Sequence, residues 1–219
     1  MKRELLSLLL VMLMFVTSCS ELLPGSEPSD EPQEEPQEKP EDEPSDSETY
    51  KVGDYYKSGL AEGVVAYVDE DGEHGLIISM DEGYTQWSTE YIMLVVQGGE
   101  FSRGDGARNT AYIKSSNENW EEIYPAVAWC DSKNVLGLSS WYLPAPQELG
   151  YAHEGLDAIN ATLVEKGCEP IATGVNDGYW TSEEYGVQGA YAFSFQLGDF
   201  ADYGHDKKSY NRVRAMRKF

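Results

Sequence analysis

The chain has 219 residues and a formal net charge of −23 at pH 7, with 39 acidic against 16 basic residues. This negative charge argues against nucleic acid as a partner, because phosphate groups would be repelled. Beyond the first twenty residues, no apolar stretch reaches the ~20 residues that a membrane-spanning helix needs. Charge and hydropathy therefore exclude nucleic-acid binding and predict no transmembrane helix in the body of the chain.

The N-terminus has the pattern of a secretory leader. Lys2 and Arg3 precede an apolar run over residues 5–16, and Thr17-Ser18-Cys19 follows it directly. Small residues before a cysteine at this place resemble a bacterial lipobox. We expect a lipoprotein signal peptide over residues 1–18, with Cys19 as the lipidated first residue of the mature protein. The alternative is an ordinary secretory peptide with a chance cysteine. The lipid predicts a cell-envelope location, in the outer membrane, facing the periplasm or exposed at the surface.

Residues 19–50 have the composition of an extended stalk. From Ser20 to Tyr50 there are twelve acidic residues and one lysine, and proline recurs at every fourth position from Pro24 to Pro44. Such a segment has little to bury, repels itself and favours polyproline II. It could reach up to ~95 Å if fully extended at ~3.1 Å per residue. A neutral spacer without a selected length is the alternative.

Residues 51–219 are long enough for one domain with a core. Period-2 and period-3.6 patterns predict strands first, then helices, then strands again. The expected strands are 62–69, 74–79, 91–96, 179–182, 190–197 and 211–219, and the expected helices are 110–115, 124–133 and 146–166. This order predicts an α+β domain with an antiparallel sheet in which N- and C-terminal strands pair.

Five short motifs then occur in a familiar order. They are A-V-A-W-C (126–130), W-Y-L-P-A-P-Q-E-L (141–149), Y-W-T-S-E-E (179–184), A-Y-A-F-S-F-Q-L-G (190–198) and R-V-R-A-M-R (212–217). They resemble the C-type-lectin-like domain at the C-terminus of the Legionella collagen-like adhesin, with similar domains in Bacteroides-type lipoproteins and Fibrobacter major paralogous proteins. The resemblance covers residues 124–219 best, and residues 52–110 resemble an N-terminal extension of the Bacteroides members. It implies a C-type-lectin-like fold with two main helices and paired terminal strands.

Proteins of that fold are mostly binders, and aromatic rings beside carboxylates suit sugars. Our candidate ligand-binding residues gather near the last strands: Trp180, Glu183, Glu184, Tyr185, Tyr191 and Tyr203. The alternative for Trp180 and Tyr191 is a place in the core, while Tyr185 and Glu184 are expected to be exposed. Arg212 and Arg214 are expected to pair with carboxylates such as Glu148. The sequence lacks the Glu-Pro-Asn, Gln-Pro-Asp and Trp-Asn-Asp motifs that calcium-dependent sugar binders of this fold carry.

Two further site hypotheses concern cysteine and calcium. Cys130 and Cys168 could form a disulfide outside the cytoplasm, and the alternative is two separate buried thiols. Asp199, Asp202 and Asp206 offer oxygen ligands for a weak calcium site, against the alternative of a solvated turn. No other cofactor is predicted.

Together these patterns predict a membrane-anchored envelope or cell-surface lipoprotein with a non-catalytic, adhesin-like domain for a glycan or protein ligand. The alternative is a structural or assembly component of the envelope or of a fimbria-like structure. No catalytic motif is present. A remote alternative is an oxidase of the formylglycine-generating type, which shares the implied fold but needs a close cysteine pair near the C-terminus.

Overall fold

The computed structural model describes residues 49–94, 101–135, 140–200 and 205–219. The chain divides into two units, Met1–Pro44 and Ser45–Phe219, and all described residues belong to the second. The predicted signal peptide, the lipidation site Cys19 and nearly all of the stalk therefore lie outside the described residues. In the described part, no helix combines the length and apolar character needed to cross a bilayer.

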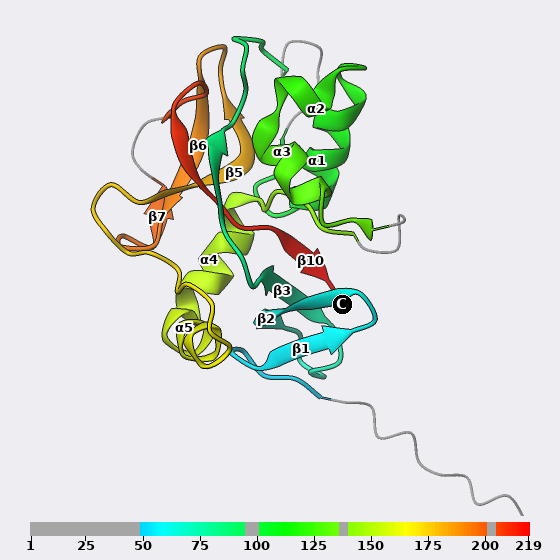
Figure 1. The fold of residues 1–219 in the computed structure, drawn as a ribbon, viewed down its shortest axis with the longest axis vertical. Helices are drawn as coiled ribbons and strands as arrows, with labels where there is room; N and C mark the ends of the chain where they lie inside the picture. Colours follow the sequence, from blue (N-terminus) through cyan, green and yellow to red (C-terminus); the bar gives the residue numbers. More distant parts are fainter. Residues whose placement is uncertain (1–48, 95–100, 136–139, 201–204) are drawn as a thin grey trace, which may run out of the picture. The chain divides into compact units, whose positions relative to one another are not determined.

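The folded unit contains strands at both ends of its sequence and helices between them (Figure 1). The strands are β1 (Tyr55–Ser58), β2 (Ala61–Val68), β3 (Gly75–Ser79), β4 (Gly83–Gln86), β5 (Gly178–Tyr185), β6 (Gly189–Ser194), β7 (Asp199–Phe200), β8 (His205–Asp206), β9 (Tyr210–Val213) and β10 (Met216–Lys218). The helices are α1 (Gly106–Ser115), α2 (Trp120–Ile123), α3 (Pro125–Asp131), α4 (Pro146–Glu154) and α5 (Leu156–Glu165).

The described strands form two sheets. Sheet A has the order β1-β2-β3-β10, and sheet B has the order β4-β9-β5-β6-β7, with β8 paired to β6. These strands pair antiparallel, except that β5 and β9 are parallel. The α+β class and the mainly antiparallel pairing are thus confirmed, and the C-terminal strand β10 joins the sheet of the N-terminal strands as expected.

The predicted first hairpin is β2–β3, and an irregularity in it shapes the surface. The register shifts between Val65 and Tyr67, which is the signature of a β-bulge. A bulge changes the direction of the side chains that follow it. Ala66 is fully buried, whereas the ring of Tyr67 is 37% exposed. The bulge therefore accounts for an exposed aromatic side chain directly after the buried run 63–66 of this strand.

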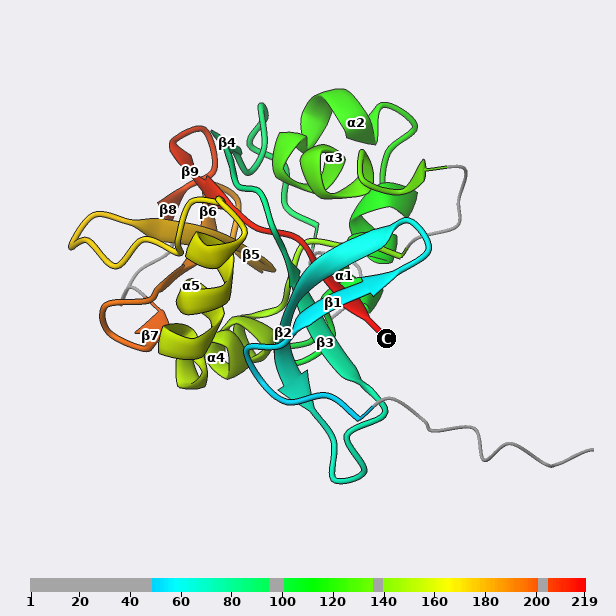
Figure 2. The ribbon, with the colours of Figure 1, turned by 60° about the horizontal axis from the view of Figure 1, so that its bottom comes forward.

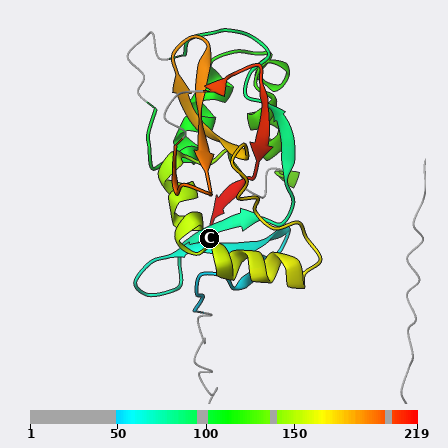
Figure 3. The same ribbon diagram turned by 90° about the vertical axis from the view of Figure 1, so that its left-hand side faces the viewer.

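The expected single strand 211–219 is wrong, because this segment contributes to both sheets. β9 lies in sheet B and β10 in sheet A, and Arg214 and Ala215 connect them (Figure 3). The backbone of Ala215 exchanges hydrogen bonds with Ser79 of sheet A, at 2.9 Å from Ser79 N and 3.1 Å to Ser79 Oγ. Residues 213–216 are all buried, so the alternation of a half-exposed strand is lost here.

The helices also differ in detail from expectation. The predicted helix 146–166 is two helices, broken at Gly155, where an added Cβ would lie 2.2 Å from Val52 Cγ1. α1 begins earlier than predicted because Asp105 caps it, accepting from Arg108 N at 3.1 Å. The described residues 91–94 of the expected strand 91–96 form no strand.

The apolar side chains form two clusters. One takes side chains from both sheets and from α1 and α3, and includes Ile77, Ile113 and Trp180. The other takes side chains from both sheets and from α4 and α5, and includes Ile78, Leu149 and Phe193. Helix α4 contacts β2 of sheet A as well as β5 and β6 of sheet B, and Figure 2 shows it beside both sheets. This helix therefore ties the two sheets together and carries part of the site described below.

Candidate functional site

The predicted aromatic candidates occupy different environments. Trp180 is fully buried and donates its indole N–H to Thr85 O at 2.9 Å, so the core alternative is confirmed for this residue. Tyr191 is partly buried, with its ring 5.1 Å from that of Tyr185 and the guanidinium of Arg103 5.6 Å over it. Tyr185 is 51% exposed, as expected. Tyr203 lies outside the described residues.

Glu184 was expected to be exposed and is buried. Its side chain and that of Lys207 both have 0% exposure, and their charged ends are in direct contact. The Lys207 ammonium also donates to Ile92 O at 2.7 Å, and Leu94 N donates to Glu184 Oε2 at 2.9 Å. Burial is the main cause that lowers the pKa of Lys207, against the carboxylate, which raises it. The pair holds residues 92–94 against the end of β5.

Glu183, the residue before Glu184 on β5, is partly buried. Its Oε1 lies 3.6 Å from the Nε of Arg103, while Oε2 is buried without a hydrogen-bond partner among the described residues. Burial raises the pKa of Glu183, and Arg103 opposes that rise. Beyond it, a hollow of about 470 Å³ lies at the turn between β5 and β6, lined by Tyr185, Val187, Gln188, Gly189 and Asp206. Of the predicted ligand-binding residues, Tyr185 lines this hollow and contacts Tyr191, whereas Trp180 and Glu184 are buried away from solvent.

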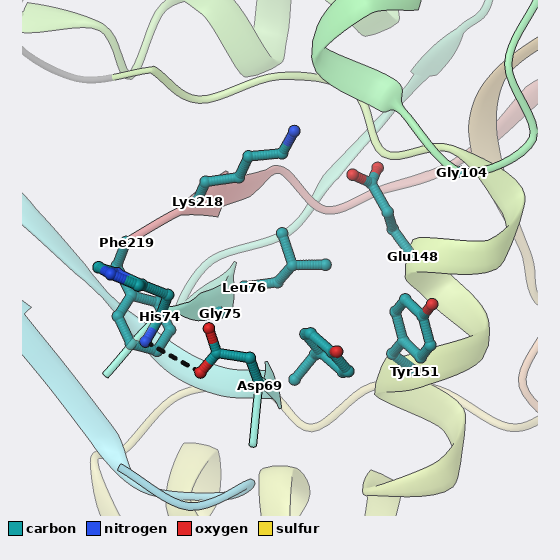
Figure 4. A pocket seen from close by; sticks show the side chains of 10 residues that line it. Asp69, His74, Gly75, Leu76, Gly104, Glu148, Tyr151, Lys218 and Phe219 are labelled. Carbon is teal, nitrogen blue, oxygen red and sulfur yellow. Dashed lines mark hydrogen bonds between the residues drawn. The ribbon is translucent and has the colours of Figure 1, made fainter. Parts of the chain in front are cut away.

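A second hollow was not foreseen, and we call it the tyrosine pocket. It encloses about 330 Å³ and is lined by Tyr67, Asp69, His74, Gly75, Leu76, Gly104, Glu148, Tyr151, Lys218 and Phe219 (Figure 4). The rings of Tyr67 from β2 and Tyr151 from α4 stack with centroids 4.6 Å apart at 30°. They are 37% and 36% exposed, respectively. The pocket therefore presents aromatic surface that is held in place from two elements.

Polar groups of several kinds surround these rings. Asp69 accepts from the backbone N–H of His74 at 3.3 Å, which fixes the carboxylate at the base of the β2–β3 turn (Figure 4). Lys218 extends from β10 toward the same space and lies 3.7 Å from Asp105. A ligand in the pocket would meet apolar ring faces, a carboxylate acceptor and a cationic donor. That combination suits a molecule with both hydroxyls and apolar faces.

Glu148 forms the inner wall of the tyrosine pocket and has only 1% exposure. Its Oε2 accepts from Ala145 N at 2.7 Å and Gly106 N at 3.1 Å, and its Oε1 accepts from the hydroxyl of Tyr142 at 2.9 Å. Burial is the largest cause acting on this carboxyl and raises its pKa, although these donors lower it. The glutamate of the W-Y-L-P-A-P-Q-E-L motif therefore joins the starts of α1 and α4.

Arg212 and Arg214 pair with carboxylates, as expected, but their partners are Glu82 and Asp177 and not Glu148. Arg212 contacts Glu82, and its Nε donates to Asp177 Oδ1 at 2.8 Å. Arg214 is fully buried and donates to Ser79 O at 2.9 Å and to Glu82 Oε2 at 3.3 Å. These contacts connect the β9–β10 junction to the segment between β3 and β4, which is a structural role.

The expected disulfide is absent, since both described cysteines are free thiols. Cys130 is fully buried in α3, and Cys168 packs partly buried against the other apolar cluster. Burial raises the pKa of Cys130 far above its ordinary value. The alternative of two separate thiols therefore describes the structure.

The calcium hypothesis finds no cluster in the part of the chain that the structure describes, where no three His, Cys, Asp or Glu side chains could hold a metal ion. Asp202 lies outside that part. Asp206 accepts from the Tyr91 hydroxyl at 2.9 Å and from Lys208 N at 2.8 Å, so its carboxylate is already occupied.

Sequence reasoning missed Tyr67, Tyr151 and Lys207. Tyr67 has the residue type and position of a core strand residue, and only the bulge exposes it. A signal was available for Tyr151, because it lies on the polar side of the predicted helix, two positions after the apolar Leu149. Lys207 sits in the turn between β8 and β9, where a lysine is usually solvated.

Comparison with known proteins shows a likeness of fold. No protein-family model and no curated protein matches the sequence. The solved structure of a fimbrial protein from Bacteroides ovatus ATCC 8483 is similar, with a TM-score of 0.56 and 16% sequence identity. The match covers 78% of this chain and 49% of that one, so this chain spans about half the length of its structural neighbour. The folded unit is thus similar in fold to part of a Bacteroides fimbrial protein.

Proposed function

We propose that this chain is a lipid-anchored component of a bacterial surface structure, and that its folded unit binds carbohydrate non-catalytically in the tyrosine pocket. The observation that carries the proposal is the stacked, one-third-exposed pair of Tyr67 and Tyr151 beside Asp69 and Lys218. Sugar rings have apolar faces that stack on aromatic rings and hydroxyls that need donors and acceptors.

The two tyrosines of the pocket are also preorganised, because each is held by a helix or strand. Tyr67 is fixed by a strand in the middle of sheet A, and Tyr151 by a helix that contacts both sheets. Sites on such elements lose little conformational entropy when a ligand binds. This favours the tyrosine pocket over the hollow at the β5–β6 turn, whose lining comes mainly from one turn.

Two independent features support the proposed location of the protein at the cell surface. The leader pattern ending at Cys19 supports a lipid anchor, and the likeness of fold to a fimbrial protein supports a role in a surface structure. A purely structural or assembly role is the second candidate, and the same likeness of fold favours it.

A glycan array probed with the full-length chain tests the proposal. We expect binding by the wild type and its loss in Tyr151→Ala, because half of the stacked pair is removed. Tyr84→Ala is the matched control, since Tyr84 is 67% exposed on β4 of the other sheet and does not line the pocket. Each measurement is repeated with calcium and with chelator, which separates calcium-dependent from calcium-independent binding.

A blank array with folded protein, or equal binding by Tyr151→Ala and wild type, contradicts carbohydrate binding at this pocket. Co-purification of the chain with other envelope proteins would then support the structural role.

A further inference from the structure

We propose that the side chains of Lys207 and Glu184 are joined by an amide bond. Nothing in this inference depends on carbohydrate binding. It starts from the complete burial of both side chains, which have 0% exposure, and from the direct contact of Lys207 Nζ with Glu184 Oε1. A nucleophile and an acyl carbon are thereby held together where no water competes.

Burial as two ions is unfavourable, because both charges lose their hydration and recover it only in part from each other. Among the described residues the cation has two further favourable contacts: Nζ donates to Ile92 O at 2.7 Å, and it lies 4.9 Å over the ring of Trp87 in a cation–π contact. These contacts replace only part of the hydration that a fully buried ammonium and carboxylate lose. Removing both charges would relieve this cost.

The neighbouring backbone groups match what an amide requires. A secondary amide has one N–H donor and one carbonyl acceptor. Ile92 O already lies where the N–H of Lys207 can donate, and Leu94 N, 2.9 Å from Glu184 Oε2, already donates to the position of the carbonyl oxygen. Condensation therefore keeps both hydrogen bonds while it eliminates two buried charges.

The reaction is a condensation that balances without any other reagent. A proton passes from the Lys207 ammonium to the Glu184 carboxylate along their contact, which gives an amine and a carboxylic acid. The amine attacks the acyl carbon Cδ, and the Leu94 N–H stabilises the negative charge that develops on Oε2. A C–N bond forms, a C–O bond breaks, and the hydroxyl leaves with the remaining amine proton as one water molecule. Burial lowers the pKa of Lys207, which favours the first step.

The bond would lock sheet B at one end. It would connect the last residues of β5 to the turn before β9, across 23 positions of sequence. Both described cysteines are free thiols, so no disulfide between them supplies such a cross-link. A covalent closure of this kind suits a protein exposed to proteases outside the cell.

Mass spectrometry of a proteolytic digest of the full-length chain tests the proposal. We expect a branched peptide that contains Lys207 and Glu184 and is lighter than the sum of its parts by one water molecule. Trypsin should not cleave after Lys207. Lys207→Arg should abolish the branched peptide, because a guanidinium stays protonated and is not a nucleophile. Lys208→Arg, one residue along and exposed, should keep it.

The result that overturns the proposal is a pair of unmodified linear peptides from the folded wild type. Loss of water mapped elsewhere, for example to a succinimide at Asp71-Gly72, also overturns it. Because the wild type alone decides the question, the test stands even if Lys207→Arg does not fold.

Discussion

Two regions of the folded unit hold a buried glutamate, and they hold it by opposite means. Glu148 is surrounded by neutral donors, two backbone N–H groups and the Tyr142 hydroxyl. Glu184 is in contact with the buried lysine Lys207. Burial raises the pKa of Glu148, and its neutral donors oppose that rise without supplying a counter-charge. The lysine beside Glu184 compensates the charge or, as proposed, removes it.

The difference shows how a buried carboxylate can serve two purposes. Around Glu148 the donors come from the starts of two helices, so the carboxylate positions α1 and α4 beside the tyrosine pocket. The partner of Glu184 comes from the turn between β8 and β9, so the pair connects that turn to the end of β5 in sheet B. The contrast can be tested by substitution of the residues on either side of it and by the pH dependence of stability.

Lys207→Met should have the largest effect, because it leaves the Glu184 carboxylate buried without its partner. We expect the free energy of unfolding to fall by about 3–5 kcal/mol, measured by chemical denaturation. Lys208→Met is the control, since the exposed Lys208 should change stability by less than about 0.5 kcal/mol. Equal stability of the two variants would show that the buried pair contributes little.

Glu148→Ala should cost about 3 kcal/mol, since three donors lose their common acceptor in the interior. Glu148→Gln keeps one acceptor oxygen and should cost about 1 kcal/mol. Urea titrations of both variants measure the difference. If alanine and glutamine cost the same, the hydrogen bonds to Oε1 and Oε2 are not what holds the two helices.

Gly106→Ala should cost about 2 kcal/mol through overpacking at the first residue of α1. An added Cβ would lie 2.5 Å from Glu148 Oε2 and 2.6 Å from Ala145 N. Gly150→Ala in α4 is the matched control, because its Cβ would meet nothing within 4 Å and should stabilise the helix by about 0.5–1 kcal/mol. Thermal unfolding of both variants should therefore shift in opposite directions, and a shift in the same direction contradicts the close contact.

The pH dependence of stability should show the smallest effect. A carboxyl whose pKa is raised on folding binds more protons when folded, so its contribution falls as pH rises from the unfolded value near 4.5 to the folded value. Each unit of difference is worth about 1.4 kcal/mol. Glu148→Gln should flatten this part of the profile, and Glu183→Gln tests the second raised carboxyl separately. An unchanged slope in both variants would mean that other groups govern the profile.

Local patterns predicted those elements whose partners are near in sequence. The β2–β3 hairpin, α3 and the strands β5 and β6 follow from alternation or helical spacing over a few residues. The close contact that excludes a Cβ at Gly155 could not be predicted, because it is made with Val52, about a hundred residues earlier. The split of the last strand was hidden for the same reason, since residues 213–216 are buried between two sheets rather than on one.

The candidate site was predicted only in part. Residue type predicted the exposure of Tyr185, but it could not show that Glu184 turns inward, because its partner Lys207 is 23 positions away in a polar turn. The tyrosine pocket needs a bulge in β2 and the packing of α4 against the same sheet. Neither leaves a periodic signal in the sequence.

The division of residues 210–218 between the two sheets has a consequence for how the unit is built. β9 lies between β4 and β5, and β10 is bonded to β3, so residues more than 120 positions apart must meet before either sheet is complete. Contacts between residues so far apart in sequence make folding slow, because the long intervening loops must close before the strands can pair. A chain still emerging from a ribosome or an export channel would therefore stay open until these residues are released. Trimming them afterwards would remove a strand from both sheets in one cut.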